Sequence, residues 1–331
     1  MGETNIMESK IQEFADKCQR IIREIQKDLV GQDEVVRDTV TAMIAGGNLL
    51  LEGVPGVGKT RLVRSLGQAF ALPFSRIQFT PDLMPADVTG TNVLETYADG
   101  RSAIVFKKGP IFSSIVLADE INRATPKTQS ALLEAMQEHK VTVAGESYTL
   151  REPFFVLATQ NPIEQDGTYP LPEAQTDRFM FKLNVEFPTA DQLYDIVTMT
   201  QKTMEETAGA VVTAEELLSM RACAKEIPIM EPIMRYTMRL VCATHPDLAD
   251  SPDCTKKYIR FGASPRAAQA LITAGKVRAL MNGRYNVAYE DIESLAFPVL
   301  RHRIKPSYAA VADKLTPDDC IRELIKSVPQ K

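Results

Sequence analysis

The sequence predicts an α/β fold, in which a parallel five-stranded sheet is sandwiched by helices and followed by a smaller, all-helical domain. Short apolar runs alternate with helical stretches as far as Phe187 and Pro188, and strand patterns vanish after these residues. Runs so short and so continuously apolar suit strands covered on both faces, which is typical of parallel sheets. The 331 residues are enough for two domains, which we expect at 1–188 and 189–331.

The first element is an amphipathic helix, because its apolar residues recur at steps of three and four. These residues are Ile11, Phe14, Cys18, Ile21, Ile25 and Leu29. The helix is expected to end before Gly31. A second helix should run from Asp33 to about Ala45, because Gly46 and Gly47 stop it.

Short apolar runs then predict the strands of the sheet. They are Leu49 to Leu51, Arg76 to Phe79, Ile115 to Ala118, Phe154 to Ala158 and Phe181 to Val185. The segment from Val141 to Leu150 differs, because apolar and polar residues alternate around a turn at Gly145. This alternation predicts a hairpin that projects between a helix and the next strand.

Helix start signals accumulate in the second half of the chain. Thr213 and Glu216 have the spacing of a capping box, while Ser264 and Thr316 are each followed by a proline. Ser or Thr at the cap and Pro at the first helical position are typical of helix starts. These signals predict the helices of the second domain.

Composition narrows the classes of function. A formal net charge of -5 provides no global basic field for a nucleic-acid backbone. Nowhere does the chain approach the roughly 20 apolar residues that a membrane span needs, and its start lacks a signal-peptide pattern. The cysteines are scattered without C-x-x-C spacing, which argues against a disulfide framework or a zinc cluster. We therefore expect a soluble, cytoplasmic protein.

A phosphate-binding loop is predicted between the first strand and the helix that follows it. It fits the pattern G-x-x-x-x-G-K-[ST] and comprises Gly53, Val54, Pro55, Gly56, Val57, Gly58, Lys59 and Thr60. Glycines let backbone N–H groups approach phosphate oxygens, and the helix N-terminus adds its positive dipole. Lys59 is expected to reach the β- and γ-phosphates and Thr60 to ligate Mg²⁺. We assign Arg61 to the same nucleotide site.

Two of the predicted strands run into polar residues at their carboxyl ends, where open α/β sheets place ligands. One ends in Asp119 and Glu120, whose carboxylates are costly to leave beside a core without a cation or a proton. Asp119 is expected to hold Mg²⁺ through its water shell, and Glu120 to orient and deprotonate the water that attacks the γ-phosphate. The other ends in Asn161, which could hydrogen-bond that water or the phosphate, or initiate a turn before Pro162.

Ordered motifs along the chain resemble those of the AAA+ ATPases, and most closely those of the MoxR family. They are GVPGVGKT, VLADEINRA, ATQNP, EAQTDRF and GASPRA, and the resemblance covers about residues 30 to 310. In this family Lys59 and Thr60 look like Walker A, Asp119 and Glu120 look like Walker B, and Asn161 looks like sensor 1. The resemblance implies an AAA+ core over 1–188 and a helical lid over 189–331.

Other roles come only from the resemblance. Arg178 is similar to the arginine finger that reaches a neighbouring subunit's nucleotide, and Arg266 looks like sensor 2, which contacts the γ-phosphate of its own subunit. Either arginine could instead form a surface ion pair. Arg123 could act at the subunit interface, although a local salt bridge is the simpler explanation.

Further segments also acquire an interpretation from the resemblance. Val30, Gly31 and Gln32 resemble the loop on the adenine side of the nucleotide, although Gly31 could be only a helix C-cap. The hairpin from Val141 to Leu150 falls where the family carries a pre-sensor hairpin, and residues 87–110 fall where it carries an insertion within helix 2. Both would face the central pore of a ring.

The resemblance implies an Mg²⁺-dependent ATPase that works as a ring, expected to be a hexamer. Such a ring would remodel client proteins or aid metal-cofactor insertion, with a von Willebrand factor A-domain protein as partner. A nucleic-acid motor of the same clade is an alternative, but the hairpin tip from Val143 to Ser147 carries no Lys or Arg. A nucleotide-gated binding module is another, but it would not need Glu120, Asn161 and Arg178.

Overall fold

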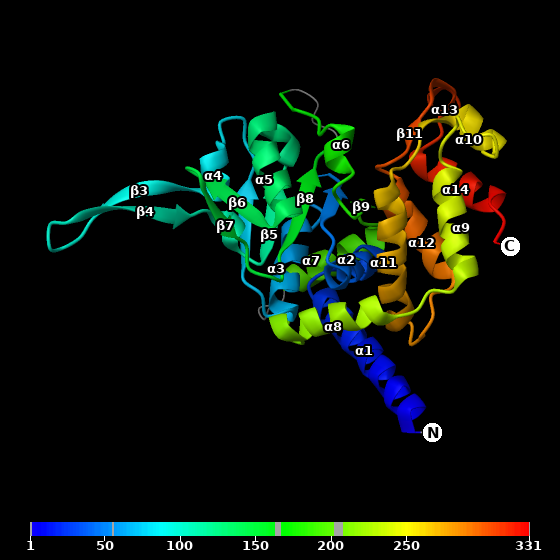
Figure 1. Ribbon diagram of the computed structural model, residues 1–331, viewed down its shortest axis with the longest axis horizontal. Coiled ribbons are helices and arrows are strands. Elements are labelled where there is room, and N and C mark those ends of the chain that lie inside the picture. Colours follow the sequence, from blue (N-terminus) through cyan, green and yellow to red (C-terminus); the bar gives the residue numbers. More distant parts are fainter. Residues whose placement is uncertain (1, 55, 163–166, 202–207, 331) are drawn as a thin grey trace.

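The computed structural model describes residues 2–54, 56–162, 167–201 and 208–330. At its centre lies a five-stranded sheet with the order β2-β5-β8-β1-β9, whose neighbouring strands are all parallel (Figure 1). The strands are β1 (Leu49–Glu52), β2 (Phe74–Gln78), β5 (Ile115–Asp119), β8 (Phe155–Gln160) and β9 (Phe181–Asn184). The predicted parallel sheet is therefore confirmed.

Helices cover both faces of the sheet. Successive residues of a strand point to opposite faces, so each central strand contributes to two cores. Leu49 and Leu51 pack into the core on one face, whereas Leu50 packs into the core on the other. The first face is covered by α1 (Gly2–Gln26), α2 (Asp33–Ala45) and α3 (Lys59–Ala69), and the second by α4 (Pro85–Thr89) and α5 (Pro126–Glu138). Both helices predicted before the sheet are confirmed, and Gly46 ends α2 in the left-handed conformation with a φ of 80°.

Strand β2 at the edge of the sheet departs from the apolar pattern of the other strands. Among its residues only Ile77 is buried, whereas every residue of β5 is buried. Arg76 and Gln78 of β2 instead make hydrogen bonds at the carboxyl end of β5. The edge strand therefore contributes polar side chains to the place where ligands are expected.

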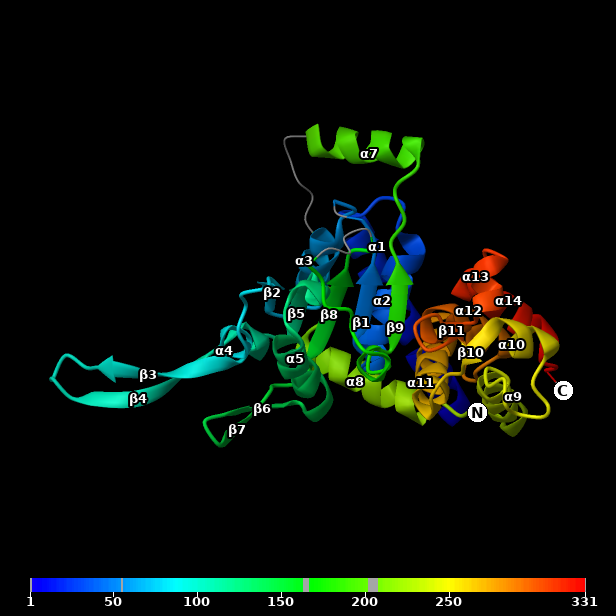
Figure 2. The same ribbon diagram turned by 90° about the horizontal axis from the view of Figure 1, so that it is seen from above.

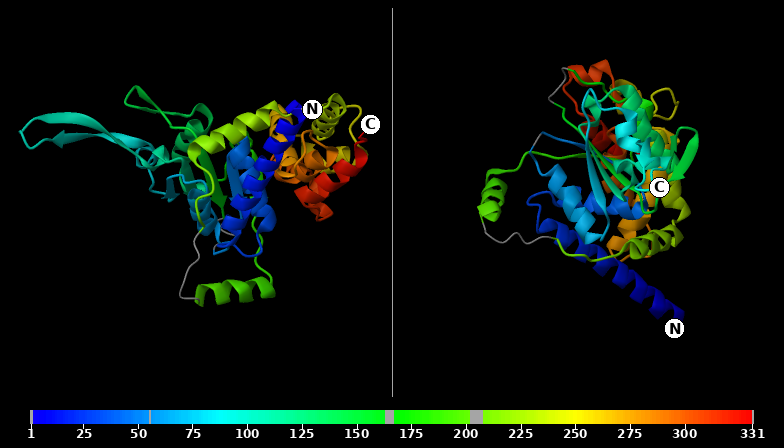
Figure 3. Two further views of the ribbon diagram at one scale, coloured as in Figure 1. Left: turned by 90° about the horizontal axis from the view of Figure 1, so that it is seen from below. Right: turned by 90° about the vertical axis from the view of Figure 1, so that its left-hand side faces the viewer.

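Two antiparallel hairpins project from the same end of the core (Figure 3). The hairpin of β6 (Lys140–Val143) and β7 (Glu146–Thr149) confirms the prediction, and its turn places Ala144 and Gly145 at φ values of 50° and 87°. The longer hairpin of β3 (Gly90–Thr96) and β4 (Ser102–Lys108) lies within the predicted insertion, but its strands were not predicted. The short helical turns near the sheet are η1 (Pro110–Phe112), η2 (Ile121–Arg123) and α6 (Glu173–Thr176).

The second half of the chain forms a helical lid. Its helices are α8 (Ala214–Glu226), α9 (Glu231–Cys242), α10 (Asp253–Tyr258), α11 (Pro265–Met281), α12 (Tyr289–Leu300), α13 (Tyr308–Ala312) and α14 (Pro317–Ser327). Thr213, Ser264 and Thr316 cap α8, α11 and α14 with their hydroxyl groups, as predicted. A small antiparallel sheet of β10 (Ile259–Phe261) and β11 (Lys305–Pro306) was not predicted, because such short strands leave no periodic pattern.

Helix α7 (Ala190–Gln201) stands apart from both regions. Figure 2 shows it beyond the ends toward which the strand arrows point. In the part of the chain that the structure describes, no helix combines the length and apolar character of a membrane span. The cysteines are free.

Candidate active site

The phosphate loop joins the carboxyl end of β1 to the first turn of α3, as predicted. Gly56 and Gly58 have φ values of 84° and 88°, which residues with a side chain rarely adopt. A Cβ atom on Gly53 would lie 2.6 Å from the carbonyl oxygen of Val185. Glycine is therefore required beside the end of β9.

The other loop residues divide between core and surface. Val57 is buried and Val54 packs against the same core, so both anchor the loop. Thr60 is exposed on the first turn of α3, and Arg61 after it is half-buried. Pro55 was also predicted to contact the nucleotide, but it lies outside the described residues.

Lys59 connects the loop to the acidic residues. Its Nζ donates a hydrogen bond to the carbonyl oxygen of Gly53 at 2.6 Å. Burial lowers the pKa of this amine, while the negative charges of Asp119 and Glu120 oppose the shift. The amine therefore lies within electrostatic reach of both carboxylates.

Asp119 is held in one orientation by neighbouring strands. The Thr159 hydroxyl on β8 donates to Asp119 Oδ1 at 2.6 Å and accepts a hydrogen bond from the Glu120 N–H at 2.8 Å. Arg76 on β2 donates to Asp119 Oδ2 from Nη2 at 2.7 Å and from Nε at 3.1 Å. The carboxylate thus lies between a hydroxyl and a guanidinium group.

Glu120 has a left-handed backbone with a φ of 55°, which is uncommon for a residue with a side chain and is often found at functional sites. Its carboxylate accepts hydrogen bonds from Gln78 Nε2 at 2.8 Å and from Arg123 Nη1 at 3.4 Å. The local salt bridge of Arg123 is therefore present. Arg76 also donates to Gln78 at 2.8 Å, so β2 links the two acidic residues.

Arg76, Gln78 and Thr159 were not assigned from the sequence. A signal was present, since Arg76 and Gln78 interrupt a run that was interpreted as apolar. Only the pairing of β5 with β2 and β8 shows that these side chains reach the carboxylates.

Asn161 follows β8 and is buried, with 6% of its surface exposed. The carbonyl oxygen of the preceding Gln160 accepts a hydrogen bond from the Gly53 N–H at 3.4 Å. The predicted sensor residue therefore lies immediately after a strand end that contacts the phosphate loop.

The segment before α2 adjoins the loop from the other side. A Cβ atom on Gly58 would lie 3.3 Å from a methyl group of Leu29, and one on Gly31 would collide with the Gln192 side chain at 2.3 Å. Because α1 ends at Gln26, Gly31 is not the C-cap of that helix. Gln32 Nε2 donates to the carbonyl oxygen of Glu186 at 3.3 Å.

Arg178 and Arg266 lie at the opposite side of the sheet, where the parallel strands have their amino ends. We call this side the amino edge, and the side with the phosphate loop the carboxyl edge. The phosphate loop follows the carboxyl end of β1, whereas Asp177 and Arg178 precede the amino end of β9, its parallel neighbour. A strand of four residues spans about 13 Å. One strand length therefore separates these arginines from the loop of their own chain.

Arg266 is held at the amino edge by an ion pair. Its Nη1 donates to Asp177 Oδ2 at 3.0 Å, and Ser264 Oγ donates to the same carboxylate at 2.8 Å. This pair places Arg266 at the edge opposite to its own phosphate loop, and the contact expected with the γ-phosphate of its own subunit stays a prediction. The ion pair considered as the alternative is present.

Arg303 fixes the segment around Arg178. Its Nε donates to Asp177 Oδ1 at 2.9 Å, and its side chain is 2% exposed. Its other N–H groups donate to the carbonyl oxygens of Asp177, Phe179, Met180 and Val299. Burial alone would raise the pKa of Asp177, but the hydrogen bonds of Ser264 and Arg266 and the charge of Arg303 lower it.

Arg178 itself is restrained less. Its Nη1 donates to the carbonyl oxygen of Leu133 on α5 at 3.1 Å. Its Nε has no hydrogen-bond partner among the residues that the structure describes. The flanking backbone is thus fixed by more contacts than the guanidinium group of Arg178 itself.

The carboxyl edge suits a magnesium-bound nucleotide. A Cβ atom on Gly56 would meet nothing within 4 Å, so the loop faces open space. Thr60 is exposed beside it, and the Asp119 carboxylate lies within electrostatic reach of the adjacent Lys59. Hydroxyl and carboxylate oxygens are ligands that Mg²⁺ prefers.

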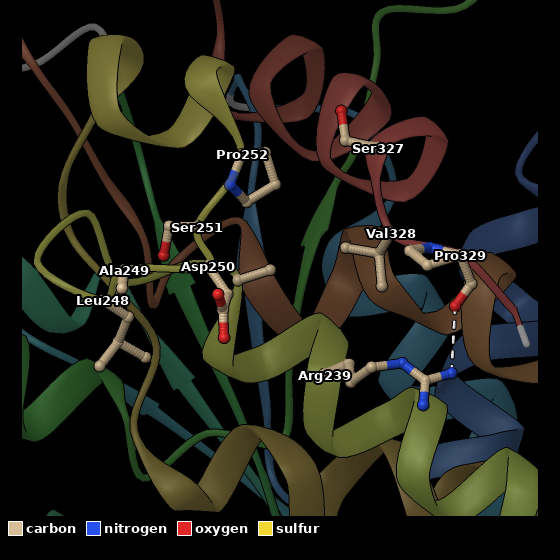
Figure 4. A pocket seen from close by; sticks show the side chains of 10 residues that line it. Arg239, Leu248, Ala249, Asp250, Ser251, Pro252, Ser327, Val328 and Pro329 are labelled. Atoms are coloured by element: carbon tan, nitrogen blue, oxygen red, sulfur yellow. Dashed lines mark hydrogen bonds between the residues drawn. The ribbon is translucent and has the colours of Figure 1, made fainter.

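A separate cavity of about 270 Å³ lies within the lid (Figure 4). It is lined by residues that include Arg239, Leu248 and Pro329, and Arg239 Nη2 donates to the carbonyl oxygen of Pro329 at 3.1 Å. None of the predicted site residues lines it. The candidate site is instead an open surface at the strand ends.

Comparisons with known proteins agree with this geometry. Residues 48–181 match the family model described as "ATPase family associated with various cellular activities (AAA)". Residues 253–324 match the model of the AAA lid domain. The first match covers the phosphate loop and the strands β1, β2, β5 and β8, and the second covers the lid from α10 into α14.

Individual relatives cover nearly the whole chain. The chain is 40% identical to Chaperone MoxR1 of Mycobacterium tuberculosis, over 94% of this chain and 81% of that protein. It is 30% identical to Protein MoxR of Methylorubrum extorquens, over 97% of each. A solved structure from Cytophaga hutchinsonii, assigned as an ATPase, has a TM-score of 0.90 and 38% identity, covering 99% of both chains.

Proposed function

The chain belongs to the MoxR family of AAA+ ATPases, and from this premise we propose that it binds ATP with Mg²⁺ and hydrolyses it to ADP and phosphate. One observation carries the proposal: Lys59, which follows β1, lies within electrostatic reach of Asp119 and Glu120 at the carboxyl end of β5, with β8 between the two strands. Ligands of open α/β sheets bind at this edge.

Each residue has a physical task in this proposal. The loop amides and Lys59 bind the phosphates, for which Lys59 releases the carbonyl oxygen of Gly53. Thr60 and Asp119 hold Mg²⁺, which neutralises charge on the phosphates when bound. Gly31 and Gln32 border the base.

Glu120 takes the proton of the attacking water, whose oxygen forms the new bond to the γ-phosphorus while the bond to the ADP oxygen breaks. Asn161 orients that water. Gln78 and Arg123 hold the Glu120 carboxylate, so Glu120 must leave the hydrogen bond of Gln78 before it takes this proton.

We propose that Arg178 and Arg266 both act on the nucleotide of a neighbouring copy. This proposal replaces the own-subunit role expected for Arg266, because Asp177 holds that residue at the amino edge. A ring, expected to be a hexamer, would bring the amino edge of one copy to the carboxyl edge of the next. Heterologous contacts of this kind form a ring when the rotation between successive copies closes.

The work done by the ring is proposed to be the remodelling of client proteins, including metal-cofactor insertion. The relative named Chaperone MoxR1 supports a chaperone role. A von Willebrand factor A-domain protein remains the proposed partner. We also propose that the boundary between the ATPase core and the lid lies near residue 188. A cytoplasmic location is proposed because free thiols persist there.

Two variants test the catalytic centre. Lys59→Ala should lose binding of magnesium ATP, because the amine that compensates phosphate charge is removed. Glu120→Gln should keep ATP binding but lose hydrolysis by about 10²–10⁴-fold, because the amide cannot accept the proton. Calorimetry measures the binding and phosphate release measures the turnover.

The two variants are each other's control, since one affects binding and the other affects chemistry. Wild-type turnover in both would show that the catalytic centre is elsewhere. Circular dichroism of each variant confirms that its fold is retained.

A further inference from the structure

Helix α7 carries apolar and acidic side chains that the described residues of the chain do not bury. None of its described side chains is buried, and Tyr194 is 73% exposed. Helices of about 12–15 residues are marginal in water without tertiary packing. An exposed helix of 12 residues is therefore expected to pack against something.

The two sides of α7 differ. Gln192 faces the body of the chain, where its side chain fills the space beside Gly31. Leu193 and Tyr194 are exposed, as are Asp191 and Asp195 on the flank, and the helix contains no Lys or Arg. The outer side is thus an apolar strip with an acidic flank.

An apolar surface with a positive charge lies on the lid. We call it the lid patch, and it consists of Arg260, Phe261, Tyr308 and Val311. Tyr308 is 85% exposed and Phe261 is 53% exposed. The guanidinium carbon of Arg260 lies 5.1 Å from the Phe261 ring centre and 6.0 Å from the Tyr308 ring centre.

The charge of Arg260 is not neutralised locally. Within the described ranges of the chain, Arg260 forms no ion pair. Tyrosine and arginine are enriched among the residues that dominate binding energy at protein interfaces. The exposed aromatic rings could pack on the apolar residues of α7, and Arg260 could pair with the aspartates on its flank.

We propose that α7 of one copy docks on the lid patch of a second copy of this chain. The inference rests on the ring proposed above, in which the amino edge of one copy meets the carboxyl edge of the next. Helix α7 stands at the carboxyl edge (Figure 2). The lid patch adjoins the amino edge, because Lys305 of the paired strands β10 and β11 forms an ion pair with Glu173 of α6 at 3.4 Å.

The docking has a consequence for catalysis. Ser264 follows Phe261 by three residues and donates to Asp177. Seating the lid patch on α7 would therefore bring Arg266 and Arg178 toward the nucleotide site beside that helix. The contact sets which copies can complete each other's sites.

Charge reversal tests the pairing. Asp195→Arg and Arg260→Glu should each weaken self-association by at least about tenfold, because each places like charges together. The double variant restores opposite charges and should recover most of the association. Sedimentation of the full chain with magnesium and a non-hydrolysable ATP analogue measures this. Arg235→Glu on α9, an exposed arginine of the same lid, is the matched control.

A crosslinking experiment identifies the chains involved. Tyr194→Cys is made in one chain and Tyr308→Cys in a second, tagged chain. A short bis-maleimide added to the mixture should join the two variants well above the background of the native cysteines. Because each chain carries one new thiol, this product can form only between copies.

The outcomes separate this inference from the proposed function. Normal assembly of both single variants, or no recovery in the double variant, overturns the docking and leaves the ATPase proposal intact. Loss of ATP binding in the wild-type chain overturns the ATPase proposal instead. A wild-type chain that binds ATP but never associates also overturns the docking.

Discussion

The carboxyl and amino edges of the sheet differ in how fully their polar groups are hydrogen-bonded within the chain. At the carboxyl edge, a Cβ atom on Gly56 would meet nothing within 4 Å, and among the described residues Lys59 hydrogen-bonds only to the carbonyl oxygen of Gly53. At the amino edge, every N–H group of the Arg303 side chain donates to a protein oxygen. The first edge suits a ligand that enters and leaves, whereas the second suits a fixed support.

Burial acts on a basic group at both edges. It lowers the pKa of Lys59, whose neighbouring carboxylates oppose the shift. It also lowers the pKa of Arg303 to about 10, against the raising effect of Asp177. Arg303 therefore stays charged near neutral pH, and its support of the Arg178 segment should not vary there.

The largest expected effect tests whether the two edges belong to different copies. Arg178→Ala should lower hydrolysis by about 10³–10⁵-fold, as expected for an arginine that acts in trans. Nucleotide binding should be nearly unchanged, because the phosphate loop is intact. Phosphate release from the assembled protein measures the loss.

Mixing provides the decisive control. A mixture of Arg178→Ala with Lys59→Ala should be more active than either variant alone. The second variant supplies its Arg178 to the intact loop of the first. No recovery in mixed assemblies would contradict the action of Arg178 in trans.

A smaller effect tests the support at the amino edge. Asp177→Asn leaves Arg303 buried without its carboxylate, which should lower the free energy of unfolding by about 3–5 kcal/mol. Because the pKa of Asp177 is lowered in the folded chain, its contribution is present above the usual aspartate pKa of about 3.9 and is lost as pH falls through the lowered value. Denaturant unfolding at neutral and acidic pH measures both.

Arg266→Ala is the matched comparison, because its side chain is half exposed. It should change the free energy of unfolding by less than about 1 kcal/mol while it lowers hydrolysis. If Asp177→Asn and Arg266→Ala lowered the free energy of unfolding equally, Arg266 would have the same structural role as Arg303.

The smallest effect concerns the carboxyl edge. Gln78→Ala removes the hydrogen bond that holds Glu120, so kcat should rise by up to about tenfold with KM unchanged. Steady-state kinetics measure this. A fall in kcat would show that Gln78 holds Glu120 in its active orientation.

Local patterns along the chain were sufficient to predict the sheet, the early helices and the phosphate loop. These features depend on neighbours along the chain, such as the glycines before Lys59 or the apolar run before Asp119. Period and spacing are local quantities, so they can be read without coordinates. The strands of the long hairpin were missed, because their side chains are mostly exposed and follow no buried pattern.

Contacts between residues far apart in the sequence became visible only in the folded chain. It placed Gln78 against Glu120, and it placed Arg266 on Asp177, at the edge opposite to its own phosphate loop. Strand order and the docking of the lid bring these residues together across many positions. Such contacts depend on the packing of whole elements, and no local pattern records them.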